Sequence, residues 1–352
     1  MTKRSPSKNS NATVKPTAID LFCGSGAVTL GLKQAGFDVL ASVDIDPIAG
    51  KTYELNHPEV DFKLKDITQV RPERDFPDLP KRIGLLAVCA PCQPFSNRNK
   101  KRSDEDDRVE LVLEAVKFAR YFQPKAIFFE NVPGIERHSV FAELTRKLSK
   151  LRYHVGKAYT VDAADLGVPQ RRPRMVLVAA KRKQHLKKLT ELGPVAIETV
   201  RDAIGDLVSP VIGQKADLKD PLHFSRRHHA ITLERLKHIP KNGGSRISLP
   251  DRLVLECHKG LADNQYPDSY GRMCWEDVAP TLTTGCTDLT KGRYSHPVED
   301  RAITLREAAR LQTFPDSYKF SGNASQVACQ IGNAVPPKMM AKIAERIAAL
   351  IQ

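Results

Sequence analysis

The chain of 352 residues is long enough for one large domain or two ordinary ones, and its 41% hydrophobic and 27% charged residues are a normal globular mixture. Its 55 basic and 41 acidic side chains leave a formal net charge of +14, which favours a polyanionic partner such as nucleic acid. An anionic membrane is the weaker alternative, because the longest apolar run, about residues 83–90, is too short to span a bilayer. The polar, basic residues at the start also lack the apolar core of a secretory signal.

Seven cysteines are an odd number, and they are spread without a short repeating framework, which indicates reduced thiols in the cytoplasm. Cys89 and Cys92 have the spacing of half a zinc site or of a redox pair. A zinc site needs a second close pair, which the sequence lacks. A thiol-redox motif normally opens a helix, whereas Pro91 and Pro94 bracket Cys92. We therefore expect no bound metal.

Residues 1–16 are expected to form a flexible basic tail, because they contain little to bury. Short apolar runs then alternate with helical periods as far as about residue 181. The predicted strands cover residues 18–22, 39–43, 84–89, 126–129 and 175–180, and the predicted helices cover residues 27–35 and about 109–116. This alternation predicts an α/β first domain, residues 17–181, with a largely parallel sheet and helices on both faces.

After residue 181 the regular periods disappear until about residue 305, and the sequence becomes rich in Arg, Lys and His and then in Gly and Thr. We expect a second, smaller and irregular domain over residues 182–325. The last segment, residues 326–352, is expected to return to the first domain through an amphipathic helix at residues 338–351.

The motif DLFCGSG, residues 20–26, follows the first predicted strand, where glycines let the backbone approach a ligand closely. Asp44 ends the second strand and is well placed to accept hydrogen bonds from ribose hydroxyls. The third glycine of a dinucleotide fingerprint is missing, since Thr29 follows instead. A nucleoside without pyrophosphate, such as S-adenosylmethionine, therefore fits better than a dinucleotide. A tight turn that binds nothing is the alternative for this motif on its own.

Three further motifs carry reactive or charged side chains. APCQPFS, residues 90–96, presents the Cys92 thiol as a nucleophile, unless that cysteine is only a small buried residue. Glu130 ends a buried strand, where partial desolvation would raise its pKa and suit it to donate a proton. VPQRRPR, residues 168–174, is a rigid cationic segment or, alternatively, a solvated basic turn. We expect these motifs to converge with the glycine loop on one edge of the sheet.

In order and spacing these segments resemble the motifs of the cytosine-C5 DNA methyltransferases of bacterial or phage type. DLFCGSG is similar to the cofactor loop of that family, APCQPFS to the nucleophile loop, ENVPG to the acid motif and VPQRRPR to the base-clamp motif. Residues 306–315 and 330–336 resemble its last two motifs. The resemblance implies a Rossmann-like S-adenosylmethionine-dependent methyltransferase sheet, with residues 182–325 as the target-recognition domain.

The resemblance also implies a role for individual residues. Cys92 is the nucleophile that adds to C6 of cytosine, Glu130 holds N3 and the amino group, and Arg174 with Arg172 is the cationic clamp. The implied cofactor-binding residues are Phe22, Gly24, Gly26, Asp44, Ile45, Asp66, Ile67, Pro91, Asn333 and Val335. Asp46 is an alternative ribose ligand to Asp44. The implied DNA-binding residues are Ser96, Arg98, Arg226, Arg227, Thr281 and Leu282.

The reaction that the resemblance implies is methyl transfer from S-adenosylmethionine to C5 of a cytosine flipped out of double-stranded DNA, with S-adenosylhomocysteine as product. We expect a monomer in the bacterial cytoplasm, associated with the nucleoid through DNA, with any cognate restriction endonuclease acting separately. One alternative is a tRNA cytosine methyltransferase, but its Cys-Phe-Thr signature is missing. Another alternative is a non-catalytic DNA-binding relative. Such a protein would be expected to have lost Cys92, Glu130 or the cofactor glycines, but all of them are present. A nicotinamide oxidoreductase is the most distant alternative.

Overall fold

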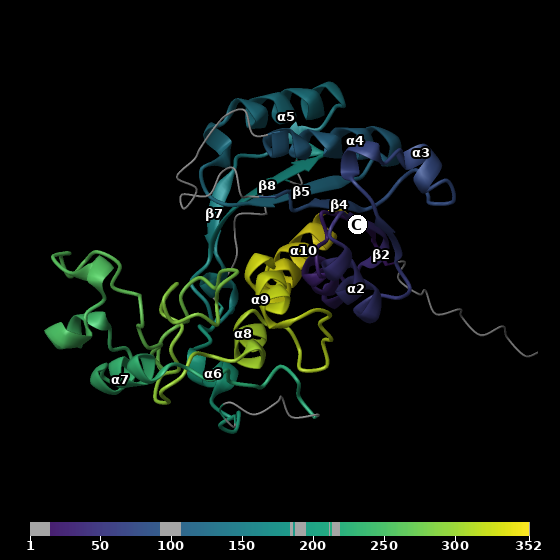
Figure 1. Ribbon diagram of the computed structural model, residues 1–352. Helices are drawn as coiled ribbons and strands as arrows, with labels where there is room; N and C mark the ends of the chain where they lie inside the picture. Colours follow the sequence, from purple (N-terminus) through teal and green to yellow (C-terminus); the bar gives the residue numbers. More distant parts are fainter. Residues whose placement is uncertain are drawn as a thin grey trace, which may run out of the picture.

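The computed structural model describes residues 15–91, 107–183, 186, 195–210, 212 and 219–351. In this described part of the chain one eight-stranded sheet has the order β3-β2-β1-β4-β5-β8-β6, with β7 paired to β8 (Figure 1). Its strands are β1 (Thr17–Leu21), β2 (Asp38–Asp44), β3 (Asp61–Leu64), β4 (Leu85–Val88), β5 (Ala126–Asn131), β6 (His154–Val155), β7 (Tyr159–Asp162) and β8 (Pro173–Ala180).

The first five strands are mutually parallel. Every residue of β4 and β5 is buried, as expected for strands that are covered by helices on both faces. All five strands therefore end at the same edge of the sheet, and the chain crosses to opposite sides of β1 when it forms β2 and β4. Ligands bind at this kind of switch point in open α/β sheets. The predicted α/β fold with a largely parallel sheet is confirmed.

The strand predicted at residues 175–180 runs in the opposite direction. β8 is antiparallel to β5, with Asn131 opposite Met175, and it is also antiparallel to β7 and β6. β7 leads into β8 through a short connection without a crossover helix, and such connections join antiparallel strands. As a result the beginning of β8, rather than its end, lies at the edge where β1 to β5 terminate.

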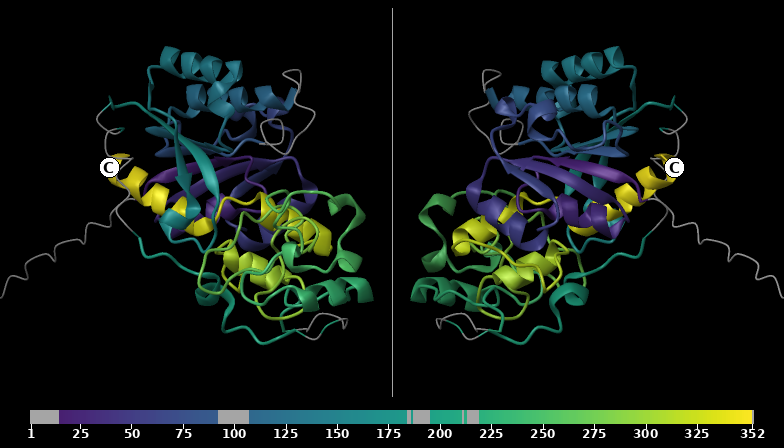
Figure 2. Two further views of the ribbon diagram at one scale, coloured as in Figure 1. Left: turned by 90° about the vertical axis from the view of Figure 1, so that its left-hand side faces the viewer. Right: turned by 90° about the vertical axis from the view of Figure 1, so that its right-hand side faces the viewer.

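Helices cover both faces of the sheet (Figures 1 and 2). One face is covered by α1 (Ala27–Gln34), α2 (Pro47–Asn56) and α10 (Pro337–Ile351), and the other by α3 (Pro72–Asp75), α4 (Ala115–Phe122) and α5 (Ser139–Lys150). The helix predicted near residues 109–116 starts as a 3-10 helix, Asp107–Glu114, and continues as α4. None of the described helices is long and apolar enough to cross a membrane.

The remaining helices belong mainly to the irregular second module. They are α6 (Val200–Ile204), α7 (Ala230–His238), α8 (Leu305–Leu311) and α9 (Ala324–Asn333). The described chain also contains short 3-10 helices in addition to the one that precedes α4. These are Ile67–Gln69, Ile135–Arg137, Ala163–Leu166, Arg246–Ser248, Asp251–Leu253 and Glu256–His258. α9 packs into the core of this module through Val327 and Ile331, whereas α10 packs on the sheet. The chain thus returns to the sheet at α10, a little after the predicted boundary at residue 326.

Buried arginines take the place of a hydrogen-bonded ladder in this module. The side chain of Arg272 is fully buried and donates hydrogen bonds to the carbonyl oxygens of Leu236, Ile239 and His296. Arg301 forms two hydrogen bonds, of 2.7 and 2.8 Å, with the carboxylate of Glu307. Carbonyl groups that no strand partner reaches are satisfied in this way, so an irregular segment can still bury its backbone.

Candidate active site

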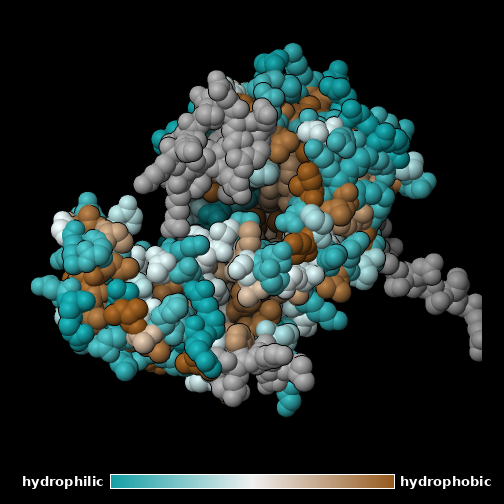
Figure 3. Space-filling model, viewed as in Figure 1, coloured by the Kyte–Doolittle hydropathy of each residue, from teal (hydrophilic) through white to brown (hydrophobic). Residues whose placement is uncertain are grey.

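The edge where β1 to β5 end faces the irregular module, and the surface is hollowed between the two (Figure 3). The glycine loop begins this edge. After β1, Phe22 (φ 61°) and Gly24 (φ 52°) turn the chain back, and the Phe22 amide donates to the carbonyl of Val43 at 2.9 Å. A methyl group added at Gly24 would meet nothing within 4 Å, so this glycine borders open space. Gly26 (φ 91°) is the N-cap of α1 and, as a glycine, provides no side-chain cap.

Asp44 ties the end of β2 to the glycine loop. Its carboxylate accepts hydrogen bonds from the amides of Gly24, at 2.7 Å, and Asp46, at 2.9 Å. Burial raises the pKa of Asp44 above its ordinary value, although these amides act in the opposite direction. The carboxylate of Asp46 is used differently, since it caps α2 by accepting from the amide of Ile48 at 2.8 Å.

Exposed apolar side chains flank Asp44. Ile45 is 65% exposed, and Leu64, whose backbone is opposite Asp44 in the sheet register, is 52% exposed. The carboxylate of Asp66 is half-buried and accepts from the amide of Thr68 at 2.9 Å through one oxygen, while Ile67 is buried. The sequence analysis did not include Leu64 among the candidate cofactor-binding residues. The signal that could have indicated it is an apolar residue at the end of a short strand at the edge of the sheet.

The nucleophile loop leaves the sheet at the end of β4. Pro91 is half-buried, and Cys92, Ser96 and Arg98 lie outside the described residues. The side-chain amide of Asn131, itself buried, donates a 3.2 Å hydrogen bond to the carbonyl of Ala90. This bond ties the start of the loop to the end of β5. Asn131 belongs to the ENVPG motif, but the sequence interpretation gave it no role of its own.

Glu130 and Arg174 form a buried ion pair at this point. The Nε atom of Arg174 lies 2.9 Å from Oε1 of Glu130, and their side chains are 12% and 8% exposed. Burial raises the pKa of Glu130 above its ordinary value, and the nearby guanidinium groups of Arg174 and Arg172 oppose that shift. The pair forms because β8 is antiparallel: in a parallel sheet the start of β8 would lie at the opposite edge.

Arg172 also lies near Glu130, but its hydrogen-bond partners differ from those of Arg174. Its buried guanidinium donates to the carbonyl oxygens of Leu282 at 2.8 Å, Gly332 at 2.8 Å and Ala334 at 2.9 Å. Besides the clamp role expected for it beside Arg174, Arg172 joins the second module and the C-terminal segment to the start of β8. Together with the side-chain oxygen of Gln170 at 3.4 Å, these carbonyl groups accept hydrogen bonds from the guanidinium.

The C-terminal segment reaches the same edge through the end of α9. The side chain of Asn333 is exposed, and its amide lies 3.4 Å from the sulfur of Cys329. Burial and the nearby carboxylate of Asp46 raise the pKa of Cys329, so α9 ends close to the start of α2. Val335 is 5% exposed and packs in the core under the sheet, so only its backbone is available to a ligand.

The residues expected to bind DNA differ in accessibility. Arg226 and Arg227 are exposed, and Arg226 lies 3.8 Å from the carboxylate of Asp288. The hydroxyl of Thr281 donates to the carbonyl of Arg171 at 2.7 Å. Leu282 is fully buried in the core of the second module, so only its backbone is available to contact DNA. The second module has no period that would have revealed this burial.

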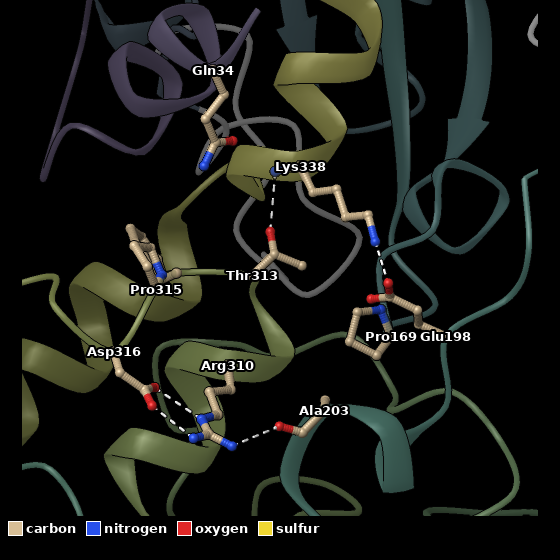
Figure 4. A pocket seen from close by; sticks show the side chains of 10 residues that line it. Gln34, Pro169, Glu198, Ala203, Arg310, Thr313, Pro315, Asp316 and Lys338 are labelled. Atoms are coloured by element: carbon tan, nitrogen blue, oxygen red, sulfur yellow. Dashed lines mark hydrogen bonds and ion pairs between the residues drawn. The ribbon is translucent and has the colours of Figure 1, made fainter.

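A different hollow lies between α8 and α10 (Figure 4), and none of the candidate site residues described above lines it. Its charged side chains are paired with one another. The guanidinium of Arg310 lies 2.6 Å from the carboxylate of Asp316, and Lys338 is paired with Glu198. Because these charges are already neutralised within the protein, the edge of the sheet is the better candidate site.

Solved structures share this architecture. A prophage-encoded protein of E. coli described as a DNA modification methyltransferase has a TM-score of 0.73 at 25% identity, and the alignment covers 96% of this chain and 99% of that one. The methyltransferase EhMeth of Entamoeba histolytica has the same fold, with a TM-score of 0.66 at 19% identity over 95% and 98% of the two chains. The sheet and its ligand edge thus define a Rossmann-like methyltransferase fold.

The sequence comparisons narrow this class. The sequence profile described as C-5 cytosine-specific DNA methylase matches residues 17–349. The Type II methylase M.HgiDII of Herpetosiphon aurantiacus is 40% identical over 345 residues, which cover 95% of each chain. The Type II methyltransferase M.XorII of Xanthomonas oryzae pv. oryzae is 33% identical over 95% of this chain and 84% of its own. The chain belongs to the C-5 cytosine-specific DNA methylase family, which confirms the resemblance seen in the sequence.

Proposed function

We propose that this protein is a DNA (cytosine-5)-methyltransferase that modifies a flipped-out cytosine in a short duplex site through a covalent bond from Cys92 to C6. The observation that carries the proposal is the buried pair of Glu130 and Arg174 beside the anchored start of the Cys92 loop. The glycine loop and Asp44 end neighbouring strands of the same sheet edge.

The residues at the glycine loop fit S-adenosylmethionine, which supplies the methyl group when bound. Gly24 borders open space, and the uncapped start of α1 offers backbone amides to a carboxylate. Asp44 would accept hydrogen bonds from the ribose, and it is preferred to Asp46, whose carboxylate caps α2. The exposed side chain of Ile45 would pack on the adenine.

Further residues complete this cofactor assignment by analogy with the family. Phe22 would also pack on the adenine, Asp66 and Ile67 would bind its edge, and Pro91, Asn333 and Val335 would close the remaining side. In the described residues the second carboxylate oxygen of Asp66 accepts no hydrogen bond, so it is available to an amino group.

The chemistry requires C5 of cytosine to become nucleophilic. The thiolate of Cys92 adds to C6, and the electron pair of the C5–C6 bond becomes available at C5. Glu130, whose pKa is raised by burial, donates a proton to N3 so that negative charge does not build up on the ring. C5 then takes the methyl group. A base removes the C5 proton, the electron pair of that C–H bond re-forms the C5–C6 double bond, and the bond to C6 breaks with Cys92 leaving as thiolate. N3 returns its proton to Glu130.

Arg174 holds Glu130 in place and presents a fixed positive charge close to the pyrimidine ring. Because that charge is buried, its interaction with a developing oxyanion at O2 is weakly screened. Arg172 would contribute indirectly, by fixing the start of β8 against the C-terminal segment.

The irregular module is proposed to recognise duplex DNA across the hollow. The net charge of +14 suits a polyanion, and Arg226 and Arg227 are exposed on this module. Ser96 and Arg98 would close over the DNA from the nucleophile loop, and Thr281 would support a base-reading loop. We propose that the protein acts as a monomer in the bacterial cytoplasm, on nucleoid DNA, with any cognate endonuclease acting separately.

Bisulfite sequencing of plasmid DNA from cells that express the chain tests the reaction and identifies the site together. We expect one methylated sequence context with the wild type and none with Cys92→Ser, because a hydroxyl is a far weaker nucleophile. Duplexes with 5-fluorocytosine at that site should trap a covalent complex only when Cys92 is present. Methylation of tRNA instead of DNA in parallel reactions would contradict the proposal.

A further inference from the structure

Two carbonyl groups of the glycine loop are held from behind by side chains outside the loop. The hydroxyl of Tyr318 donates a 2.5 Å hydrogen bond to the carbonyl of Ser25, and Nε2 of His57 lies 3.0 Å from the carbonyl of Gly26. Tyr318 is 5% exposed, His57 2% and Ser25 6%. A methyl group added at Gly26 would lie 2.6 Å from His57 and 2.8 Å from the Tyr318 hydroxyl, so only glycine allows this approach.

Lys33 determines the direction of the hydrogen bonds that His57 forms. Its ammonium group, which can only donate, lies 2.8 Å from Nδ1 of His57, so Nδ1 accepts and Nε2 carries the proton. Nε2 therefore donates to the carbonyl of Gly26, with the Tyr318 oxygen 3.2 Å away as a second acceptor. Burial, with Lys33 nearby, lowers the pKa of His57 to about 4, so the ring is neutral near pH 7.

The residues that follow Tyr318 also contact α2, the helix that begins just after Asp44 and Ile45. The backbone of Lys319 exchanges two hydrogen bonds with the side chain of Asn56, of 2.8 and 3.0 Å. The amide of Ser321 donates to the hydroxyl of Thr52 at 2.8 Å. Residues 318–321 thus connect the glycine loop and α2, and the ring of Tyr318 packs in the core of the second module.

Capture of the carbonyl of Gly26 orients the amide of Ala27, while the carbonyl held by Tyr318 fixes the peptide whose amide, that of Gly26, donates to the carbonyl of Cys23 at 2.9 Å. In a trans peptide the carbonyl and the following N–H point in opposite directions. When His57 and the backbone of α1 hold the carbonyl of Gly26, the N–H of Ala27 points away from His57. That amide is one of the uncapped donors at the start of α1, which we assign to the methionine end of S-adenosylmethionine.

We propose that Tyr318 is a positioning residue: with His57 it holds the Ser25 and Gly26 peptides in the binding conformation and so increases the affinity for S-adenosylmethionine without touching it. This inference rests on the proposed function, because it assumes that the glycine loop binds this cofactor. It assigns to residues 318–321 a role in cofactor binding, although they follow the second module in the chain.

Titration calorimetry with S-adenosylhomocysteine on the full chain tests the proposal. We expect Tyr318→Phe to weaken binding about tenfold, as for loss of one buried hydrogen bond to a positioned peptide. The Michaelis constant for S-adenosylmethionine should rise by a similar factor, while kcat at saturating cofactor and DNA affinity without cofactor should change less than twofold. Tyr153→Phe is the matched control, since its hydroxyl donates 2.8 Å to the carbonyl of Pro124, also in a buried position. It should leave cofactor affinity unchanged.

Substitutions at His57 provide a second, independent measurement. His57→Gln keeps an N–H donor for the carbonyl of Gly26 and should weaken binding less than His57→Leu, which has none. Binding within twofold of the wild type for both Tyr318→Phe and His57→Leu would overturn the positioning role. An equal loss of DNA affinity in Tyr318→Phe would also overturn it, because that would indicate general disruption. If the wild type itself does not bind S-adenosylhomocysteine, the proposed function fails, and the inference fails with it.

Discussion

Nε of Arg174 lies 2.9 Å from the carboxylate of Glu130, and protein atoms cover both side chains almost completely. The two residues come from strands that run in opposite directions, so the pair joins the end of β5 to the beginning of β8. A buried carboxyl beside a fixed cation suits proton donation at a site where charge develops.

Replacing the Glu130 carboxyl by an amide tests the acid role. We expect Glu130→Gln to lower kcat at least 100-fold, since an amide keeps the shape and the hydrogen bonds but does not transfer a proton to N3. Single-turnover transfer of a labelled methyl group measures this rate. Glu143→Gln on α5, which removes a carboxylate that is paired with Lys147 far from the site, should keep wild-type activity. Activity of Glu130→Gln within threefold of the wild type would exclude the acid role.

Removal of Arg174 should change the pH dependence as well as the rate. Arg174 opposes the burial that raises the pKa of Glu130, so in Arg174→Ala that pKa should rise further. Because the acid acts in its protonated form, the fall of kcat at high pH should move to higher pH, while the maximal rate decreases. A pH–rate profile of wild type and variant measures both effects. A shift of the basic limb to lower pH would contradict the assignment.

Asp20 should make folding stability depend on pH. It is fully buried under the glycine loop, one of its oxygens accepts from Thr29 at 2.8 Å, and the other has no hydrogen-bond partner in the described residues. Burial raises the pKa of Asp20 from 3.8 to about 7. The folded state therefore holds a proton that the unfolded state has lost between these values, and stability due to Asp20 decreases as pH rises from about 4 to about 7.

Asp20→Asn should remove this dependence. The free energy of unfolding of the variant, relative to the wild type, should increase with pH across that window, by at most about 1.4 kcal/mol per pH unit. Urea denaturation at pH 5 and pH 8 measures the difference. The lowered pKa of His57 makes stability increase with pH between about 4 and the ordinary pKa of histidine. This contribution is the same in the wild type and the variant, so it cancels in the comparison. An equal difference at both pH values would show that Asp20 stays ionised.

The ion pair of Arg301 and Glu307 should be important for stability. Each side chain is 1% exposed, and Glu307→Gln removes one of the two carboxylates paired with the buried guanidinium, while Glu299 remains at 2.8 Å. We expect a loss of about 1–3 kcal/mol in the free energy of unfolding. Glu345→Gln, which breaks an exposed pair with Lys342 at 3.2 Å, is the control and should cost less than about 1 kcal/mol. Similar losses in the two variants, measured by urea denaturation, would contradict the expectation.

DNA binding should weaken steeply as salt rises. For about six phosphate contacts, the slope of log K against log salt concentration is expected near −5, because each contact releases condensed counterions. Replacing both Arg226 and Arg227 by Ala should reduce the slope by about 2 and weaken all sequences alike, since both are exposed and are proposed to contact phosphates. Fluorescence anisotropy of labelled duplexes at several salt concentrations measures this slope for the wild type and the variant. An unchanged slope would remove these arginines from the interface.

The sequence alone was sufficient for the parts of the protein that depend on local pattern. Apolar runs predicted β1, β2, β4, β5 and β8, since burial on both faces of a sheet requires such runs, and helical periods predicted α1, α10 and the start of α4. They did not predict β3, α2 or α5. The ends of these strands place the glycine loop and Glu130 at one edge once the strands are parallel, because side chains that follow parallel strands meet there. The order of the motifs then indicated the family.

The tertiary structure decided what depends on strand direction and on distant contacts. An apolar run reads the same in both directions, so the sequence did not reveal that β8 is antiparallel, although this direction is what brings Arg174 to the edge where it was expected beside Glu130. The burial of Leu282 and the carbonyl partners of Arg172 arise in a module without periodicity. The contact between Tyr318 and Ser25 joins residues 293 positions apart. Such contacts depend on how elements that are distant in the sequence pack against one another, and a local pattern of residue types does not predict that packing.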